Sequence, residues 1–145
     1  MKDPLVKLCG YLLQRASADA VADLNRRLAP LGLRHAGAAM LMLIEARPGI
    51  TQSQAGRILD IQRANMVPFV ARLEALGVIR RRRVDGRSQA LELTSRGRVL
   101  LERARRVIQA HEAMLLGRVP PELRSAVLPV LTALWSPEAP PEEGG

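Results

Sequence analysis

Cysteine, histidine and aromatic residues are scarce in this chain, with one, two and three of them among 145 residues. The single cysteine, Cys9, excludes an internal disulfide and a multi-cysteine zinc cluster, and it is typical of a reducing cytoplasm. The few aromatic rings argue against modules that hold single-stranded nucleic acid by stacking bases. Long apolar runs are also absent, so we expect a soluble, cytoplasmic protein without a signal peptide or a membrane partner.

The same scarcity limits the enzyme classes that the chain can represent. His111-Glu112 is half of a zinc-protease signature, but Leu115 stands where the second histidine is needed. The sequence has no glycine-rich phosphate loop and no cysteine pair, and two histidines leave no convincing Ser/His/Asp set. We therefore predict no enzymatic activity, no catalytic residues, no metal site and no cofactor.

Positive charge, in contrast, is abundant, with a formal net charge of +8 at pH 7. Nine arginines and only three acidic residues lie between Ile61 and Arg98, and four of the arginines are consecutive, at 80–83. Such crowding costs Coulomb energy unless a polyanion neutralises it. Taken alone, the run fits a solvated face as well as a surface for phosphate or anionic lipid.

Caps, breakers and apolar spacing predict a mainly helical chain. Asp3 as N-cap and Pro4 at the first helical position begin a long amphipathic helix over about 4–28. A second helix is expected over about 34–46. Thr51 and Gln54 then form a capping box, which begins a helix of only two turns.

A further helix follows after a tight turn and ends at Gly77. Residues 78–94 predict a β-hairpin around Asp85-Gly86. Thr94 or Ser95 caps a long helix to about Gly117, and another helix runs from Pro120-Pro121 to about Trp135. We expect one domain over 1–135 and a disordered tail over 136–145, which has almost no apolar surface to bury.

This order of elements predicts a mainly α fold with a small β-hairpin wing. A winged helix-turn-helix over about 33–97 is flanked by long helices over about 4–28 and 95–135. In such a fold the second helix enters the major groove of duplex DNA, and an arginine at the hairpin tip can reach the minor groove. The surplus apolar surface of the flanking helices predicts burial against a second copy in a homodimer.

The start of the predicted recognition helix carries groups that suit base edges. Arg63 can bind guanine, and the amides of Gln62 and Asn65 suit adenine, although helix capping is open for both amides. Pro68 removes an amide donor from the helix interior, so a kink or a delayed helix start is also expected. The full set of predicted DNA-binding residues is Gln62, Arg63, Ala64, Asn65, Val67, Pro68, Arg72, Arg82, Arg83, Asp85 and Arg87, with Ala64, Val67 and Pro68 suited to thymine methyl groups.

The segment from Ile50 to Gly97 resembles the MarR (multiple-antibiotic-resistance regulator) family. The resemblance is carried chiefly by Asp85-x-Arg87 followed by Leu93-Thr94-x-x-Gly97, and the long flanking helices match that family's dimerisation helices. It implies a homodimeric, ligand-responsive repressor released from a pseudo-palindromic operator. It also implies that Arg87 is the minor-groove arginine and that Asp85 orients the wing tip through a charged hydrogen bond.

The resemblance further implies an effector pocket between the dimerisation helices and the winged domain, for a small aromatic or phenolic metabolite. Tyr11, His35 and His111 are the polar candidates for this pocket, and ordinary core or surface roles are open for both histidines. Methionines suit its apolar lining. The candidates for that lining are Met40, Met42 and Met114.

Two alternative functions are open at this point. Cys9 lies where the organic-peroxide-sensing branch of the same family has its reactive thiol, but Leu13 and His35 occupy the places of the tyrosines that hold the thiolate there. A small buried hydrophobe is therefore favoured over a redox sensor. The second alternative is a basic protein that binds DNA without sequence preference, with similar affinities for specific and random duplexes.

Overall fold

The computed structural model describes residues 3–135, which form two compact units. The first unit runs through Gln109, and the second begins at Ala110, inside the last long helix. A single domain over 1–135 stays a prediction. The predicted disordered tail, 136–145, lies outside the described residues.

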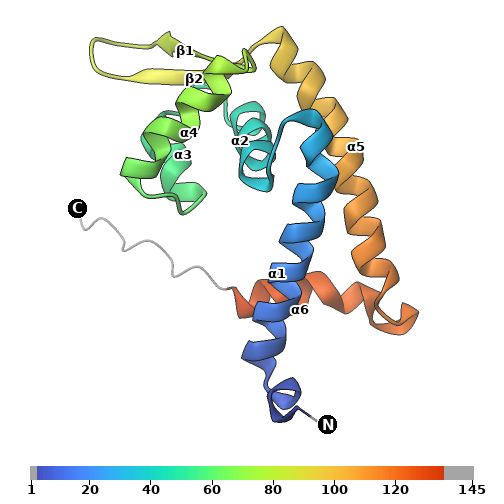
Figure 1. Cartoon of the computed structure of the whole chain (residues 1–145). Helices are drawn as coiled ribbons and strands as arrows, with labels where there is room; N and C mark the ends of the chain where they lie inside the picture. Colours follow the sequence, from blue (N-terminus) through green and yellow to red (C-terminus); the bar gives the residue numbers. More distant parts are fainter. Residues whose placement is uncertain (1–2, 136–145) are drawn as a thin grey trace, which may run out of the picture. The chain divides into compact units, whose positions relative to one another are not determined.

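The chain is mainly helical with a two-stranded antiparallel hairpin, so the predicted fold class is confirmed (Figure 1). No helix within residues 3–135 combines the length and apolar character needed to cross a membrane. The elements in chain order are η1 (Pro4–Lys7), α1 (Cys9–Leu28), η2 (Ala29–Leu31), α2 (His35–Ala46), α3 (Gln52–Ile58), α4 (Arg63–Ala75), β1 (Ile79–Arg83), β2 (Gln89–Leu93), α5 (Ser95–Gly117), η3 (Pro121–Ala126) and α6 (Val127–Leu134).

The N-terminal segment differs from the prediction in one respect. Asp3 does act as an N-cap, accepting a hydrogen bond from the Leu5 amide at 2.9 Å, but it caps a short 3-10 helix instead of α1. Leu8 takes an extended conformation and separates the two elements. The long helix therefore begins at Cys9, five residues later than Pro4.

The N-terminus of α2 is satisfied by a residue distant in sequence. The side chain of Arg34, at the N-cap position, makes no capping hydrogen bond. The Asn25 side-chain oxygen on α1 accepts the His35 amide at 2.7 Å, and the His35 ring Nδ1 lies 3.1 Å from the same oxygen. This contact ties α2 to the end of α1. An ion pair between Arg105 of α5 and Glu45 ties α2 to α5 and lowers the pKa of the Glu45 carboxyl.

The predicted capping box begins α3. The Gln54 amide donates to Thr51 Oγ1 at 3.3 Å, and the Thr51 amide donates to Gln54 Oε1 at 3.0 Å. The helix lasts seven residues, as the two-turn prediction requires.

The turn between α3 and α4 is held by backbone hydrogen bonds. The Ile61 amide donates to the Gly56 carbonyl at 2.9 Å, and Asp60 adopts a positive φ of 53°. This left-handed residue at a helix C-terminus costs roughly 1 kcal/mol for a side chain other than glycine. A Cβ on Gly56 would lie 3.0 Å from Met66 Cγ, so α3 and α4 pack closely.

Strand β2 of the hairpin is joined to the segment that precedes α3. Its strands pair in a regular antiparallel register, from Ile79 opposite Leu93 to Arg83 opposite Gln89. The Leu91 amide donates to the Ile50 carbonyl at 2.8 Å, beside an isolated bridge between Thr51 and Ala90. These contacts fix the hairpin against the segment that precedes α3.

The junction of β2 with α5 explains the Leu93-Thr94-x-x-Gly97 motif. Thr94 Oγ1 accepts the Gly97 amide at 3.0 Å and donates to the Gly77 carbonyl at 2.6 Å, so Thr94 caps α5. A Cβ on Gly97 would lie 2.0 Å from the Val78 carbonyl oxygen. The chain can cross itself here only because residue 97 has no side chain.

The core of the first unit is mainly aliphatic and includes Met40 and Met66. Fully buried side chains come from α1, α2, α4, β2 and α5, and the one phenylalanine, Phe69, is only partly buried against them. The largest buried side chains are Leu28, Met40, Leu41, Met66, Leu91, Leu101, Val70 and Val78.

The second unit contains the end of α5, η3 and α6. Arg124 Nε donates to the carbonyls of Leu116 and Val119, each at 3.0 Å, and so covers two acceptors at the end of α5. The apolar side chains of the second unit are largely exposed in the single chain. These exposed residues are Leu123, Leu128, Val130, Leu131, Leu134 and Trp135.

Candidate nucleic-acid interface

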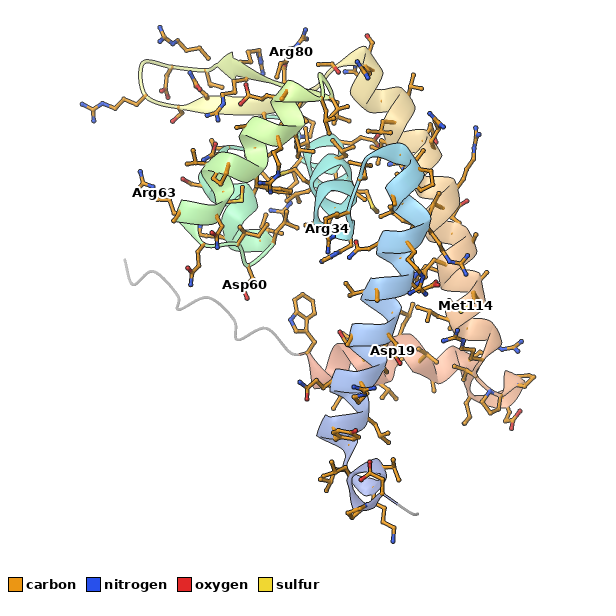
Figure 2. The ribbon with its side chains drawn as sticks, in the orientation of Figure 1. Asp19, Arg34, Asp60, Arg63, Arg80 and Met114 are labelled. Carbon is orange, nitrogen blue, oxygen red and sulfur yellow. The ribbon has the colours of Figure 1, made fainter. Side chains whose placement is uncertain are left out.

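Burial fixes how α4 presents its side chains. Met66, Val70 and Leu73 are buried against the core. The remaining faces of the helix are exposed, and Figure 2 shows Arg63 pointing outward from its N-terminal end. All eleven residues predicted to bind DNA are exposed, on α4, on the hairpin or at the helix start.

The predicted alternatives for the start of α4 are resolved. Gln62 occupies the N-cap position, but its side chain makes no capping hydrogen bond, and the helix begins at Arg63. Asn65 lies inside the first turn. Both amide side chains therefore stay available to a ligand.

Pro68 lies inside α4, and the helix continues through it to Ala75. The expected delay of the helix start does not occur. Because proline has no amide hydrogen, the Ala64 carbonyl lacks the donor that residue 68 supplies in a regular helix. The exposed position of Pro68 keeps this carbonyl away from the apolar core.

Arginines at the base of the wing are paired within the protein. Glu92 accepts from Arg80 at 3.2 Å and from Arg82 at 2.5 Å. Glu74 accepts from Arg81 at 2.8 Å and so connects α4 to β1. The local positive charge is therefore smaller than the arginine count indicates.

The tip of the wing is organised by Asp85. Its Oδ1 atom accepts the Arg87 amide at 2.9 Å and the Ser88 amide at 2.8 Å. The backbone hydrogen bonds from Arg87 and Ser88 lower the pKa of the Asp85 carboxyl. Because the Asp85 carboxylate is ionised, its two bonds to backbone amides are charged hydrogen bonds at the wing tip. Asp85 thus shapes the loop that carries Arg87, without holding the Arg87 guanidinium.

A groove of about 600 Å³ lies between the hairpin, α3 and the start of α4. Guanidinium groups from three elements line it, beside the polar side chains at the start of α3. This concentration of positive charge suits the anionic phosphate backbone of a nucleic acid. Its arginines are Arg57, Arg63, Arg81, Arg83 and Arg87.

Sequence reasoning missed Arg57. The residue is exposed on α3, three positions after Gln54 of the capping box, and it lines the groove together with Arg63. Its position in the second turn of a helix packed beside α4 was the available signal. Arg72, in contrast, is exposed on α4 but is not among the residues that line this groove.

The predicted effector residues have different environments. Tyr11 is half-buried on α1, His35 is exposed at the start of α2, and Met40 is fully buried in the core. Met40 can contact an effector only if the core opens. Met42, also on α2, is exposed. In the second unit, His111 is buried and Met114 is half-buried. None of these residues lines the arginine-rich groove or the cavities beside Pro48, Ile61 and Pro30.

Cys9 is exposed in the single chain, which corrects the expectation of a small buried hydrophobe. It is the first residue of α1 and follows the extended Leu8. Within residues 3–135, His, Cys, Asp and Glu side chains form no group of three or more that could hold a metal ion.

Comparison with known proteins identifies relatives with this architecture. No protein-family model matches the chain. The HTH-type transcriptional repressor Rv2887 of Mycobacterium tuberculosis (strain ATCC 25618 / H37Rv) is 32% identical over 112 residues, covering 76% of this chain and 81% of the relative. The structure of this MarR family protein in complex with salicylic acid aligns with a TM-score of 0.71 and 30% identity over 87% of this chain and 95% of that chain.

A second relative is the transcriptional repressor CouR. Its structure bound to a 23-mer DNA duplex aligns with a TM-score of 0.86 and 33% identity, covering 92% of this chain and 97% of that chain. CouR has also been solved bound to p-coumaroyl-CoA. Identity of 30% or more over most of both chains, with the same winged helix-turn-helix, shows that this chain belongs to the MarR family of transcriptional regulators.

Proposed function

We propose that this chain is a cytoplasmic, homodimeric repressor that binds a pseudo-palindromic operator and is released by a small aromatic acid or its CoA thioester. The observation that carries the proposal is the arginine-lined groove between the wing and α4. In this arrangement α4 enters the major groove with Arg63 at its N-terminal end, the wing tip carries Arg87 to the adjacent minor groove, and Arg57 meets the phosphates between them.

Exposed apolar side chains support the dimer. In the first unit, Leu8 is 54% exposed at the start of α1, and in the second unit Leu128 is 68% exposed on α6. Surfaces of this kind are usually covered by a second copy in dimeric proteins. Sedimentation should give twice the chain mass of 15.9 kDa. A monomer that still binds an operator tightly would contradict the dimer.

The effector class is supported by what the two relatives bind. Rv2887 was solved with salicylic acid and CouR with p-coumaroyl-CoA, and both ligands carry an aromatic ring with an acyl group. In this chain the accessible polar candidates are Tyr11 and His35. An effector releases DNA only by binding better to a dimer whose reading helices are wrongly spaced, which reduces operator affinity reciprocally.

Selection of genomic fragments by the purified protein tests operator binding. A retained fragment and a random duplex of equal length are then compared by fluorescence anisotropy over a range of salt concentrations. We expect the specific duplex to bind at least about 10³-fold more tightly. Similar affinities for both duplexes would favour the alternative of a basic protein without sequence preference.

Salicylate and p-coumaroyl-CoA are the probes for release. Each is added to the complex with the selected fragment, with free CoA as the control for the nucleotide part alone. We expect at least one aromatic ligand, but not CoA, to raise the apparent Kd. The Cys9→Ser variant should respond identically, and peroxide should release neither protein. Peroxide release that requires Cys9 would favour the redox alternative.

A further inference from the structure

The exposed face of α4 has an apolar centre. Its four residues are called the apolar stripe below, and none has a side-chain hydrogen-bonding group. Val67 is 55% exposed, although valine is usually buried. The members of the apolar stripe are Ala64, Val67, Pro68 and Ala71, and all four are exposed.

Polar side chains lie only at the two borders of the stripe. Arg63 and Arg72 are nine residues apart, which places them on opposite sides of the helix, roughly 180° apart at 3.6 residues per turn. The stripe occupies the arc between them, opposite the buried Met66. Hydrogen bonds from α4 side chains to bases are therefore available at the borders of this face and not at its centre.

We infer that the apolar stripe reads thymine through its 5-methyl group, so that the centre of each operator half-site is specified by methyl contacts. This inference rests on the proposed operator binding. Thymine presents the one apolar group among the base edges of the major groove. Three of the four side chains are alanine or proline, and such short side chains let the helix axis approach the groove floor closely.

The surroundings of the stripe favour DNA over a protein partner. Arg63 lies at the stripe's edge and also lines the cationic groove with Arg57 and Arg83. An occupant must therefore be apolar at its centre and strongly anionic at its border. A duplex with thymines in the major groove meets both requirements, because phosphates flank the groove and methyl groups lie on its floor.

Uracil substitution tests the inference, because uracil differs from thymine only by the missing methyl group. A binding site is first selected with the full-length protein from a random duplex library, and each thymine is then replaced singly by uracil. We expect about fourfold weaker binding for each thymine under the stripe. Positions outside the half-site centres should change less than about twofold by the same reasoning.

Protein variants connect the methyl effect to the stripe. Val67→Ala should reduce the thymine-to-uracil affinity ratio at one position per half-site toward one. Val99→Ala is the matched control, because Val99 is 64% exposed on α5 and lies outside the apolar stripe and the arginine-lined groove, and it should keep the full ratio.

Two failures are distinguishable. If no duplex is enriched in the selection, the proposed operator binding is overturned. If a site is enriched but uracil is tolerated at every position, or if Val67→Ala keeps the full ratio at every thymine, the methyl readout alone is overturned.

Discussion

At the base of the wing, Arg80 and Arg82 share Glu92, whereas at the tip Arg83 and Arg87 have no ion-pair partner within residues 3–135. Arginine side chains thus have two different roles in one hairpin. Base arginines join the strands to each other and to α4, and tip arginines keep their charge available for DNA. Counting arginines along the sequence therefore overstates the charge that the wing presents to a duplex.

Adding one methyl group at Gly97, which packs against Val78 beside the base of the wing, should have the largest effect on stability. In Gly97→Ala the new Cβ would lie 2.0 Å from the Val78 carbonyl oxygen, so the backbone must shift. We expect destabilisation of about 3 kcal/mol or more, measured by urea unfolding followed by circular dichroism. Gly86→Ala at the tip is the control, because a Cβ there meets nothing within 4 Å. Equal losses in the two variants would contradict the comparison.

Removing a tip arginine should weaken operator binding more than removing a base arginine. We expect Arg87→Ala to raise the operator Kd about tenfold and to reduce the salt slope by about one, because a free cation leaves the interface. Arg82→Ala should change Kd less than about threefold, because Arg82 is held in an ion pair with Glu92. Salt titrations of both variants measure the difference, and indistinguishable slopes would show that base and tip contribute alike.

Loosening the tip without removing an arginine should have a smaller effect. Asp85→Ala loses the acceptor of the Arg87 and Ser88 amides, so the loop that carries Arg87 becomes less ordered. We expect about fivefold weaker operator binding, since part of the ordering entropy is then lost on binding. The urea midpoint should stay unchanged, and a large shift in it would instead indicate a structural role in the whole unit.

The titration of Asp85 tests, without any substitution, whether its carboxylate orders the loop that carries Arg87. Its folded pKa is lowered from the ordinary 3.8, so its contribution is fully present above that value and is lost as pH falls through the lower folded pKa. Amide chemical shifts of Arg87 and Ser88 should therefore stay constant at neutral pH and change only below about pH 4. A transition near neutral pH would contradict the assignment to Asp85.

Releasing the base arginines should have the smallest effect, in the opposite direction. Glu92→Gln frees Arg80 and Arg82, so binding to a random duplex should tighten about two- to threefold and its salt slope should steepen. Glu102→Gln on α5 makes the same change in net charge away from the wing and serves as the control. Equal tightening in both variants would mean that net charge alone decides the effect.

Local chemistry made much of the fold predictable. The capping box at Thr51, the hairpin turn at Asp85-Gly86 and the cap at Thr94 each depend on residues a few positions apart, and each is present as predicted. The 3-10 helix before Cys9 was not predicted, because Asp3 and Pro4 suit the start of either helix type.

The candidate site was predictable only in part. Exposure of the α4 residues followed from apolar spacing, but the partner of Arg81 is seven residues away on another element and has no local signal. Arg57 joined the site only when α3, α4 and the hairpin came together around one groove.

The sequence by itself determined the order of helices and strands, the capped ends and the side of α4 that is buried, because these depend on contacts within about one helical turn or one hairpin. Tertiary structure alone decided which wing arginines are held in ion pairs and which are not. That choice depends on side-chain distances of a few ångströms among α4, β1 and β2, because Coulomb energy and hydrogen-bond geometry change steeply over such distances.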